Sequence, residues 1–492
     1  MHKSSLLEII RTFTPKELIK FEDFVNSPYF NKNKNVIKLF AEVIKYRPEF
    51  NNENLEKELV WKKLFPEKNY NYGIMKNIIH DLTGLSEKFI LLEKYSGESF
   101  RCELDLIEAG NSRNLQKFTS GKLDQFEKKI KSEADPNKYS SINGFLTVAG
   151  GFYDTKSSFI HEYNLKQDRE EYLRLASDYS LFNFLVRSFK LLHNTFANEV
   201  HGNRPVRKTL LEKFFVKLKE HSILEDLLIN ENENKDQDKI SKIVMCFHLM
   251  YKAVTSDRDI AEYYKFKSYL RENIELFSGH EIKNLNNCRN TCAILLKISD
   301  SEVAKESLDW IKFLMEKNII LLRSGLMYNT TMLNAVNYSV RLKEISFAEE
   351  FLNRYSGNLP AESRENTTNY CMAMIHFGKG NFGKSLEYLS RISDEKLIRK
   401  YFVKRLYLKI YYELNDYESF IYAFDTFSHF KKRNKLTNET RAMAFNNFGS
   451  NIRSLFKLRN SFEKFESIKL RKETGDQIWF IEKIDEIEKV II

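Results

Sequence analysis

Residues 150–157 come nearest to a nucleotide-binding motif, because a glycine pair is followed by Lys156 and Ser157. A phosphate-binding loop of the type Gly-x-x-x-x-Gly-Lys-Ser needs a glycine directly before the lysine, so that backbone N–H groups can wrap the phosphates. Thr155 stands at that position, and no strand pattern precedes the segment. We therefore interpret the glycines as a bend or a close contact between helices, and reject a nucleotide site.

The cysteines and histidines are the residue types that most often hold a metal ion, but their spacing here does not form a site. Cys288 and Cys292 are four residues apart and would share a helix face, yet His280 is too far along to complete a ligand set. We predict that both cysteines are small core residues. His161 precedes a glutamate but lacks the second histidine of a His-Glu-x-x-His metal-binding helix.

Nucleophilic catalysis also lacks its usual residue pattern. The sequence contains no Gly-x-Ser-x-Gly motif that would place a serine on a strand-to-helix turn. Carboxylates brought together by folding stay an alternative route to acid–base chemistry. Because no catalytic or metal-binding constellation is recognisable, we expect no enzymatic activity and no cofactor.

The elements that would position functional side chains are expected to be long helices. The chain has 492 residues, of which 42% are hydrophobic and 30% are charged, as in folded proteins, and this length predicts two or three structural units. Only 7 prolines and 17 glycines occur, which is too few for the many turns of a strand-rich fold. The composition therefore favours an all-α protein.

The net charge of +10 at pH 7 favours an acidic partner such as nucleic acid, anionic lipid or an acidic protein. The alternative is compositional bias, since charges of both signs alternate along most of the chain. Five cysteines, a small and odd number, indicate a reducing compartment and no disulfide framework. Because the N-terminus lacks a secretory pattern and no apolar stretch could span a bilayer, we expect a cytoplasmic protein.

Three regions are distinguished along the chain: an N-terminal helical unit at 1–95, a middle helical region at 96–238 and helical repeats at 239–492. In the first region, Thr14, Pro15 and Glu17 form a capping box that predicts the start of a helix. A polar linker is predicted at 230–238, and whether the middle region joins the repeats stays open. A longer helix is predicted over 72–92, with a buried stripe of Ile74, Ile78, Ile79, Leu82, Leu85, Phe89 and Leu92.

The C-terminal region repeats a helix–turn–helix phrase, with clear copies at 342–348, 378–385 and 413–418. Intervals of 35 to 43 residues between the apolar residues that open the second helices are typical of stacked two-helix repeats. These residues are Ile260, Val303, Ile345, Phe382, Tyr417 and Leu458. A closing helix that covers the last apolar face is predicted from Trp479, Phe480, Ile484 and Ile487.

The repeat phrases resemble tetratricopeptide repeats, which place a small residue on the second helix and a large apolar residue four positions later. Ala348 and Leu352 fit this spacing, as do Ser385 and Leu389. Pro360 fits the proline eight positions after that, whereas the tryptophan and glycine of the family's first helix are absent. The resemblance covers about 320–430 closely and 240–472 more loosely, and it implies an antiparallel helix-pair α-solenoid.

Two further phrases, at 27–31 and 411–414, look similar to a class of bacterial helical-repeat proteins that brings no known activity with it. In tetratricopeptide-like stacks the first helices line a concave inner groove. By this resemblance we expect a scaffold or adaptor that binds a protein or peptide, and acidic groups would suit the groove. The alternative is a solvated face without a partner. The residues that the resemblance directs into the groove are Asn337, Tyr370, Arg405, Lys409, Asn446 and Arg453.

A rival hypothesis is a nucleic-acid-associated regulator whose basic N-terminal unit docks on DNA while the repeats sense a partner. Helical patterns on both sides of Pro66 could form a helix-turn-helix, and the net charge is positive. The lysines near this turn are Lys57, Lys62, Lys63, Lys68 and Lys76. Salt-dependent binding of DNA by this unit is the observation that would separate the two hypotheses.

Overall fold

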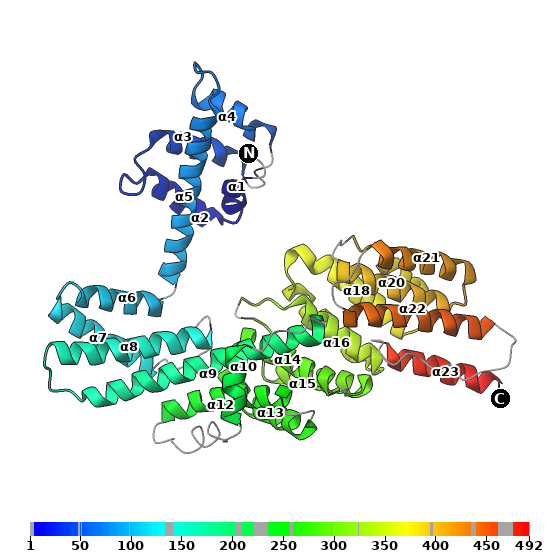
Figure 1. Ribbon diagram of the computed structural model, residues 1–492. Helices are drawn as coiled ribbons and strands as arrows, with labels where there is room; N and C mark the ends of the chain where they lie inside the picture. Colours follow the sequence, from blue (N-terminus) through cyan, green and yellow to red (C-terminus); the bar gives the residue numbers. More distant parts are fainter. Residues whose placement is uncertain are drawn as a thin grey trace. The chain divides into compact units, whose positions relative to one another are not determined.

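The computed structural model describes the chain apart from residues 1–3, 48–49, 51, 98, 133–140, 203–208, 220–234, 256–258, 297, 323, 394–396, 434–438, 461–475 and 492. Every regular element among the described residues is a helix, and none of them is a strand (Figure 1). The prediction of an all-α, solenoid-like fold is therefore confirmed.

The chain divides into two compact units, one made of residues 1–132 and 151–173 and the other of residues 133–150 and 174–492. The boundaries predicted near 95 and 238 stay predictions. Residues 230–234 of the predicted linker lie outside the described residues. Residues 235–238 belong to a helix that begins at Lys235.

The first unit contains seven complete α-helices and two short 3-10 turns among its described residues. Their bounds are α1 Ser5–Ile10, α2 Pro15–Asn26, α3 Lys34–Val43, η1 Ile44–Tyr46, η2 Glu53–Leu55, α4 Lys57–Leu64, α5 Tyr72–Gly97, α6 Ser99–Asn111 and α7 Gln116–Ser132. Helices α8 (Ile142–Glu162) and α9 (Arg169–Gly202) contribute residues to both units.

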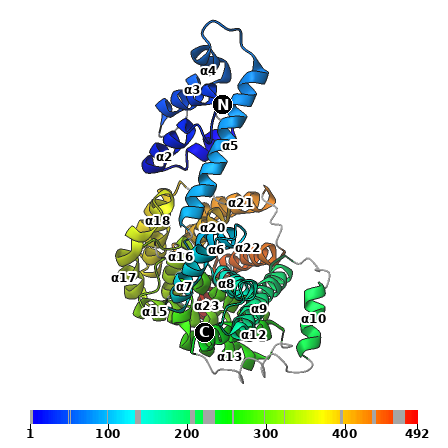
Figure 2. The same ribbon diagram turned by 90° about the vertical axis from the view of Figure 1, so that its left-hand side faces the viewer.

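The N-terminal core forms around the long helix α5. It packs against α1, α2 and α3 (Figure 2). Helix α2 begins at Pro15, as predicted, and Thr14 and Glu17 form both hydrogen bonds of the capping box. Ile74 and Leu92 of the predicted buried stripe are 47% and 42% exposed, which corrects that expectation. The reason is that the neighbouring helices cover only the middle of α5, from Met75 to Phe89.

The second unit begins with the N-terminal part of α8 and most of α9, and continues as a series of helices that pack mainly against their chain neighbours. The bounds of the remaining helices are α10 Leu210–Lys219, α12 Lys235–Thr255, α13 Ile260–Glu272, η4 Ile274–Leu276, α14 Gly279–Leu295, α15 Asp300–Glu316, α16 Asn329–Arg341, α17 Ile345–Tyr355, η5 Ser356–Asn358, α18 Ala361–Gly378, α19 Phe382–Ser390, α20 Leu397–Glu413, α21 Tyr417–Arg433, α22 Glu439–Asn460 and α23 Gln477–Ile491.

The three repeated phrases form turns of one shared design. Lys343, Gly380 and Asn415 have φ of 62°, 73° and 53°, so each ends its helix in the left-handed conformation. In each turn, the N–H of the next residue donates to the carbonyl oxygen five residues back, at 2.8, 2.9 and 3.1 Å respectively. This hydrogen bond satisfies a carbonyl that the helix end leaves free, and it reverses the chain within three residues.

Four second helices begin at the predicted apolar residue, namely α13 at Ile260, α17 at Ile345, α19 at Phe382 and α21 at Tyr417. Val303 lies in the first turn of α15, which begins at Asp300. The sixth position is wrong, because Leu458 lies near the end of α22 and opens no helix. The last repeat therefore lacks a second helix at the predicted place.

Small residues let the paired helices approach closely. Ala348 and Ser385 are fully buried where their helices meet the preceding ones, and the Ser385 hydroxyl donates to the Ala373 carbonyl oxygen at 2.7 Å. Gly378 leaves no room for a Cβ, which would lie 2.6 Å from the Ile345 Cδ1 atom.

The stack has one apolar core along α15 to α20 and a second, aromatic-rich core along α20 to α23.

Candidate binding groove

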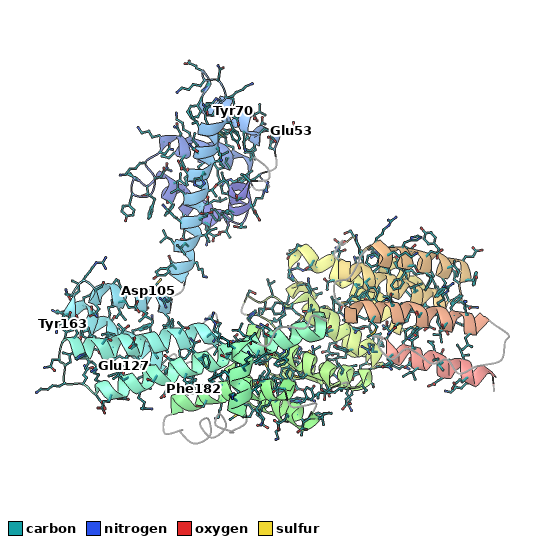
Figure 3. The ribbon with its side chains drawn as sticks, in the orientation of Figure 1. Glu53, Tyr70, Asp105, Glu127, Tyr163 and Phe182 are labelled. Carbon is teal, nitrogen blue, oxygen red and sulfur yellow. The ribbon has the colours of Figure 1, made fainter. Side chains whose placement is uncertain are left out.

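The residues first considered for chemistry are structural. The segment 150–157 lies inside α8, and a Cβ at Gly151 would approach the Leu104 Cδ2 atom to 3.2 Å, so this glycine allows close helix packing. Lys156 is buried and paired with Glu127 of α7, whose position is marked in Figure 3. Because the ammonium group is already bound to a carboxylate, it is not available to a phosphate.

The cysteine pair on α14 is buried, as predicted for core residues. Burial raises the pKa of the Cys292 thiol to about 12 and the pKa of Cys288 well above its usual value. Both thiols are therefore protonated at neutral pH and unreactive. Among the described residues, no group of three or more histidine, cysteine, aspartate or glutamate side chains is arranged to hold a metal ion.

A cavity of about 200 Å³ lies near α9, α12 and α14 and is lined by both polar and apolar residues, among them Lys190, Glu281 and Phe247. Lys190 Nζ lies 3.2 Å from Glu281 Oε1, so the two charges neutralise each other. The volume is below the roughly 300 Å³ at which ligand pockets begin. This cavity is therefore not the candidate site.

Two basic residues of the expected groove, Arg405 and Lys409, lie one turn apart on α20 and reach the same carboxylate. Arg405 pairs with Asp476, and Lys409 Nζ lies 3.5 Å from the Asp476 Oδ1 atom. The three side chains are nearly buried, with exposures of 11%, 11% and 12%. Asp476 directly precedes α23, so a carboxylate from the C-terminal segment pairs with two basic residues of the expected groove.

Aromatic rings surround both basic side chains. The Arg405 guanidinium lies 4.7 Å from the centre of the Phe448 ring, and the Lys409 ammonium lies 4.7 Å from Phe377 and 4.9 Å from Trp479. Cations over ring faces are attracted by the negative quadrupole. Burial, followed by the charges of Arg405 and Arg341, lowers the pKa of Lys409 to about 7.

Helix α23 adds an apolar anchor beside this ion pair. The Trp479 ring meets Tyr412 of α20 edge-on at 5.3 Å, and its Nε1 donates to Glu413 Oε1 at 2.8 Å. Phe480 meets Phe448 of α22 at 5.6 Å between ring centres. The helix therefore lies against α20 and α22, and Figure 1 shows it, in red, beside α22.

Two further charged contacts extend along α23. Lys483 Nζ lies 3.0 Å from Glu413 Oε2, and Glu482 Oε1 lies 3.0 Å from the ammonium of Lys343, in the turn between α16 and α17. Helix α23 also contacts α15. It thus contacts the last repeats and also an earlier helix, and the expectation of a closing helix stays a prediction.

The other expected groove residues are distributed more widely. Burial raises the pKa of Tyr370 on α18. The positive charge of Arg405 lies close enough to oppose this rise. Asn337 is half-buried on α16, and Asn446 is exposed on α22. Arg453 is also exposed, and its guanidinium lies 5.5 Å from the Phe424 ring of α21, away from the Asp476 pair. Membership of all six in one groove stays a prediction.

Sequence reasoning missed Asp476 and the partners of Trp479, namely Tyr412 and Glu413. The signal was present in part, since an aspartate three residues before Trp479 starts an amphipathic helix. Nothing in the sequence, however, relates that aspartate to Arg405, which lies 71 residues earlier.

Comparison of the chain with protein-family models, with curated proteins and with solved structures finds no match. None of the helices in the described part of the chain combines the length and the apolar character that crossing a membrane requires.

Proposed function

We propose that this chain is a non-enzymatic scaffold or adaptor that binds a protein or peptide segment along the inner groove of a tetratricopeptide-like solenoid. The proposal includes the repeat type: Ala348, Leu352, Ser385 and Leu389 are buried at the spacing expected of second helices. The single observation that carries it is the contact of Asp476, directly before α23, with Arg405 and Lys409. The groove surface therefore has the chemistry needed to hold a polypeptide.

The ligand class follows from the side chains that line this surface. Arg405 offers a planar guanidinium that suits carboxylates, and it is held between aromatic rings. Tyr412 and Phe448 provide ring surfaces on which a large aromatic residue packs, as Trp479 and Phe480 do. A polypeptide with acidic and aromatic residues would satisfy both kinds of contact.

The test is affinity capture from a cell extract with the full-length chain and with a variant carrying Arg405→Glu and Lys409→Glu. We expect the variant to lose a specific protein partner, because two like charges would then face the partner's carboxylates. The matched control is Arg391→Glu, since Arg391 is exposed beside α19 and its carboxylate partner Glu387 is exposed as well. If the double variant retains every specific partner while remaining helical, the groove is not the binding surface.

A further inference from the structure

Helix α23 lies further from the preceding helix in sequence than the second helices lie from theirs. The pairs α16–α17, α18–α19 and α20–α21 are connected by residues 342–344, 379–381 and 414–416, which form the short turns described above. Between α22 and α23 lie residues 461–476, a connection several times longer. The described contacts of α23 with α20 and α22 therefore define its place on the repeats.

Those contacts are complementary in charge. Helix α23 and the residue before it carry five carboxylates, at Asp476, Glu482, Asp485, Glu486 and Glu488, and two lysines, at Lys483 and Lys489. The carboxylates of Asp476 and Glu482 face Arg405, Lys409 and Lys343. An acidic helix thus lies beside three basic side chains, while its own Lys483 faces Glu413 of α20.

We propose that α23 is the chain's own ligand for the groove, and that the external partner is an acidic amphipathic helix that displaces it. Such a helix presents a carboxylate just before its first turn, where Asp476 lies, and a large aromatic residue three positions later, where Trp479 lies. This inference rests on the proposed function, and it names the partner class for the same groove. The affinity of α23 for the groove sets the affinity that an external helix must exceed to displace it.

The probe is a fluorescein-labelled synthetic peptide with the sequence of residues 476–491, and its binding is measured by fluorescence anisotropy. The hosts are the full-length chain and a full-length release variant carrying Trp479→Ala and Phe480→Ala, which removes both anchors of α23 and leaves the groove side chains unchanged. We expect the release variant to bind the probe at least about tenfold more tightly, because the tethered competitor is weakened.

Two controls assign the binding to the groove. A probe with Asp476→Arg should lose at least about tenfold in affinity for the release variant, and Arg405→Asp in that host should restore part of the loss by exchanging the charges. Equal binding to the full-length and release chains, or no binding by a release variant that keeps its helical circular dichroism, would overturn the proposal.

A measurement on the unaltered chain guards against a release variant that does not fold. Amide hydrogen exchange should be at least about tenfold faster in α23 than in α20, because a docked ligand opens without unfolding the repeats. Identical rates in both helices would show that α23 is part of the cooperative core and would overturn the proposal.

Failure of this inference can be separated from failure of the proposed function. If the probe binds through Arg405 but no cellular partner depends on Arg405 and Lys409, the assignment of α23 as the chain's own ligand stands, whereas the proposed function and the external partner class fail. If a partner depends on those residues but the release variant does not bind the probe, the proposed function stands and the assignment of α23 as a ligand fails.

Discussion

Asp476 is the single residue on which the arrangement at the groove depends most. Its carboxylate serves Arg405 and Lys409 together in a nearly buried site. A buried pair contributes little relative to an apolar replacement of both partners, but removal of one partner leaves an uncompensated buried charge. Removal of the Asp476 carboxylate alone should therefore destabilise the folded chain, even though the intact pair adds little relative to an apolar pair.

We predict that Asp476→Asn lowers the free energy of unfolding by on the order of 3 kcal/mol, since the Arg405 charge loses its partner while it stays surrounded by rings. Urea unfolding followed by circular dichroism and tryptophan fluorescence measures the change. Glu387→Gln is the control, because Glu387 and Arg391 are 57% and 51% exposed and should contribute less than about 0.5 kcal/mol. Equal effects of the two substitutions would contradict the buried pairing.

Lys409 predicts a dependence of stability on pH. Its pKa is lowered from 10.5 to about 7 by burial and by the charges of Arg405 and Arg341, while Asp476 is already bonded to Arg405. Between pH 7 and about 10 the unfolded chain holds a proton at this lysine that the folded chain has released. The free energy of unfolding should therefore rise with pH in this window, and below pH 7 the group should contribute no further change.

The measurement compares the unaltered chain with Lys409→Met at pH 7 and pH 9. We expect the stability of the unaltered chain relative to the variant to increase by more than about 1 kcal/mol over this interval. A difference that is the same at both pH values would show that Lys409 keeps its proton in the folded chain.

At the scale of elements, the short turns set the geometry of the repeats. Each turn places one residue in the left-handed conformation, but only Gly380 is a glycine, whereas Lys343 and Asn415 carry side chains. Asparagine tolerates this conformation better than most residues, and lysine adopts it at some cost. The hydrogen bond that closes each turn, together with helix packing, compensates for that cost.

Three glycines near one turn should respond differently to alanine. Gly378→Ala should cost about 1–2 kcal/mol, because the new Cβ would lie 2.6 Å from Ile345 Cδ1 and 2.9 Å from Val340 Cγ1. Gly380→Ala should cost about 1 kcal/mol for its φ of 73° alone, since no atom lies within 4 Å of the new Cβ. Thermal unfolding measures these changes.

Gly383→Ala is the matched control for that series. The position lies in helix α19, and no atom lies within 4 Å of its added Cβ, so the melting temperature should stay unchanged or rise. A loss of stability at Gly383 as large as that at Gly378 would mean that steric crowding is not the cause.

At the scale of the whole molecule, the rival hypothesis of nucleic-acid binding depends on free positive charge in the N-terminal unit. Lys63 Nζ lies 2.8 Å from Glu42 Oε1, and Lys57 and Lys68 lie over the rings of Tyr72 and Phe65. The Glu42 carboxylate offsets the Lys63 charge that phosphates would otherwise meet.

We therefore expect the full-length chain to show no retardation of duplex DNA in a mobility-shift titration at about 50 mM salt. Retardation that weakens steeply between about 50 and 200 mM salt would favour the regulator instead. A variant with Lys62→Glu and Lys76→Glu, two exposed positions beside Pro66, would then locate the contact.

The sequence by itself determined what depends on near neighbours. The capping box at Thr14 and the openings of helices at Ile345, Phe382 and Tyr417 were predicted correctly, because side-chain periodicity and turn chemistry act over a few residues. The extrapolation to Leu458 was wrong because it continued a spacing where the local turn signal was missing.

Only the tertiary structure decided what meets across long separations. Asp476 lies 71 residues from Arg405, and Trp479 lies 66 residues from Glu413, yet each pair is in contact. Which carboxylate a buried arginine binds depends on desolvation and on the packing of whole helices, and neither leaves a periodic pattern in the chain. Apolar periodicity therefore predicted that α23 exists, whereas its place on the groove had to be seen.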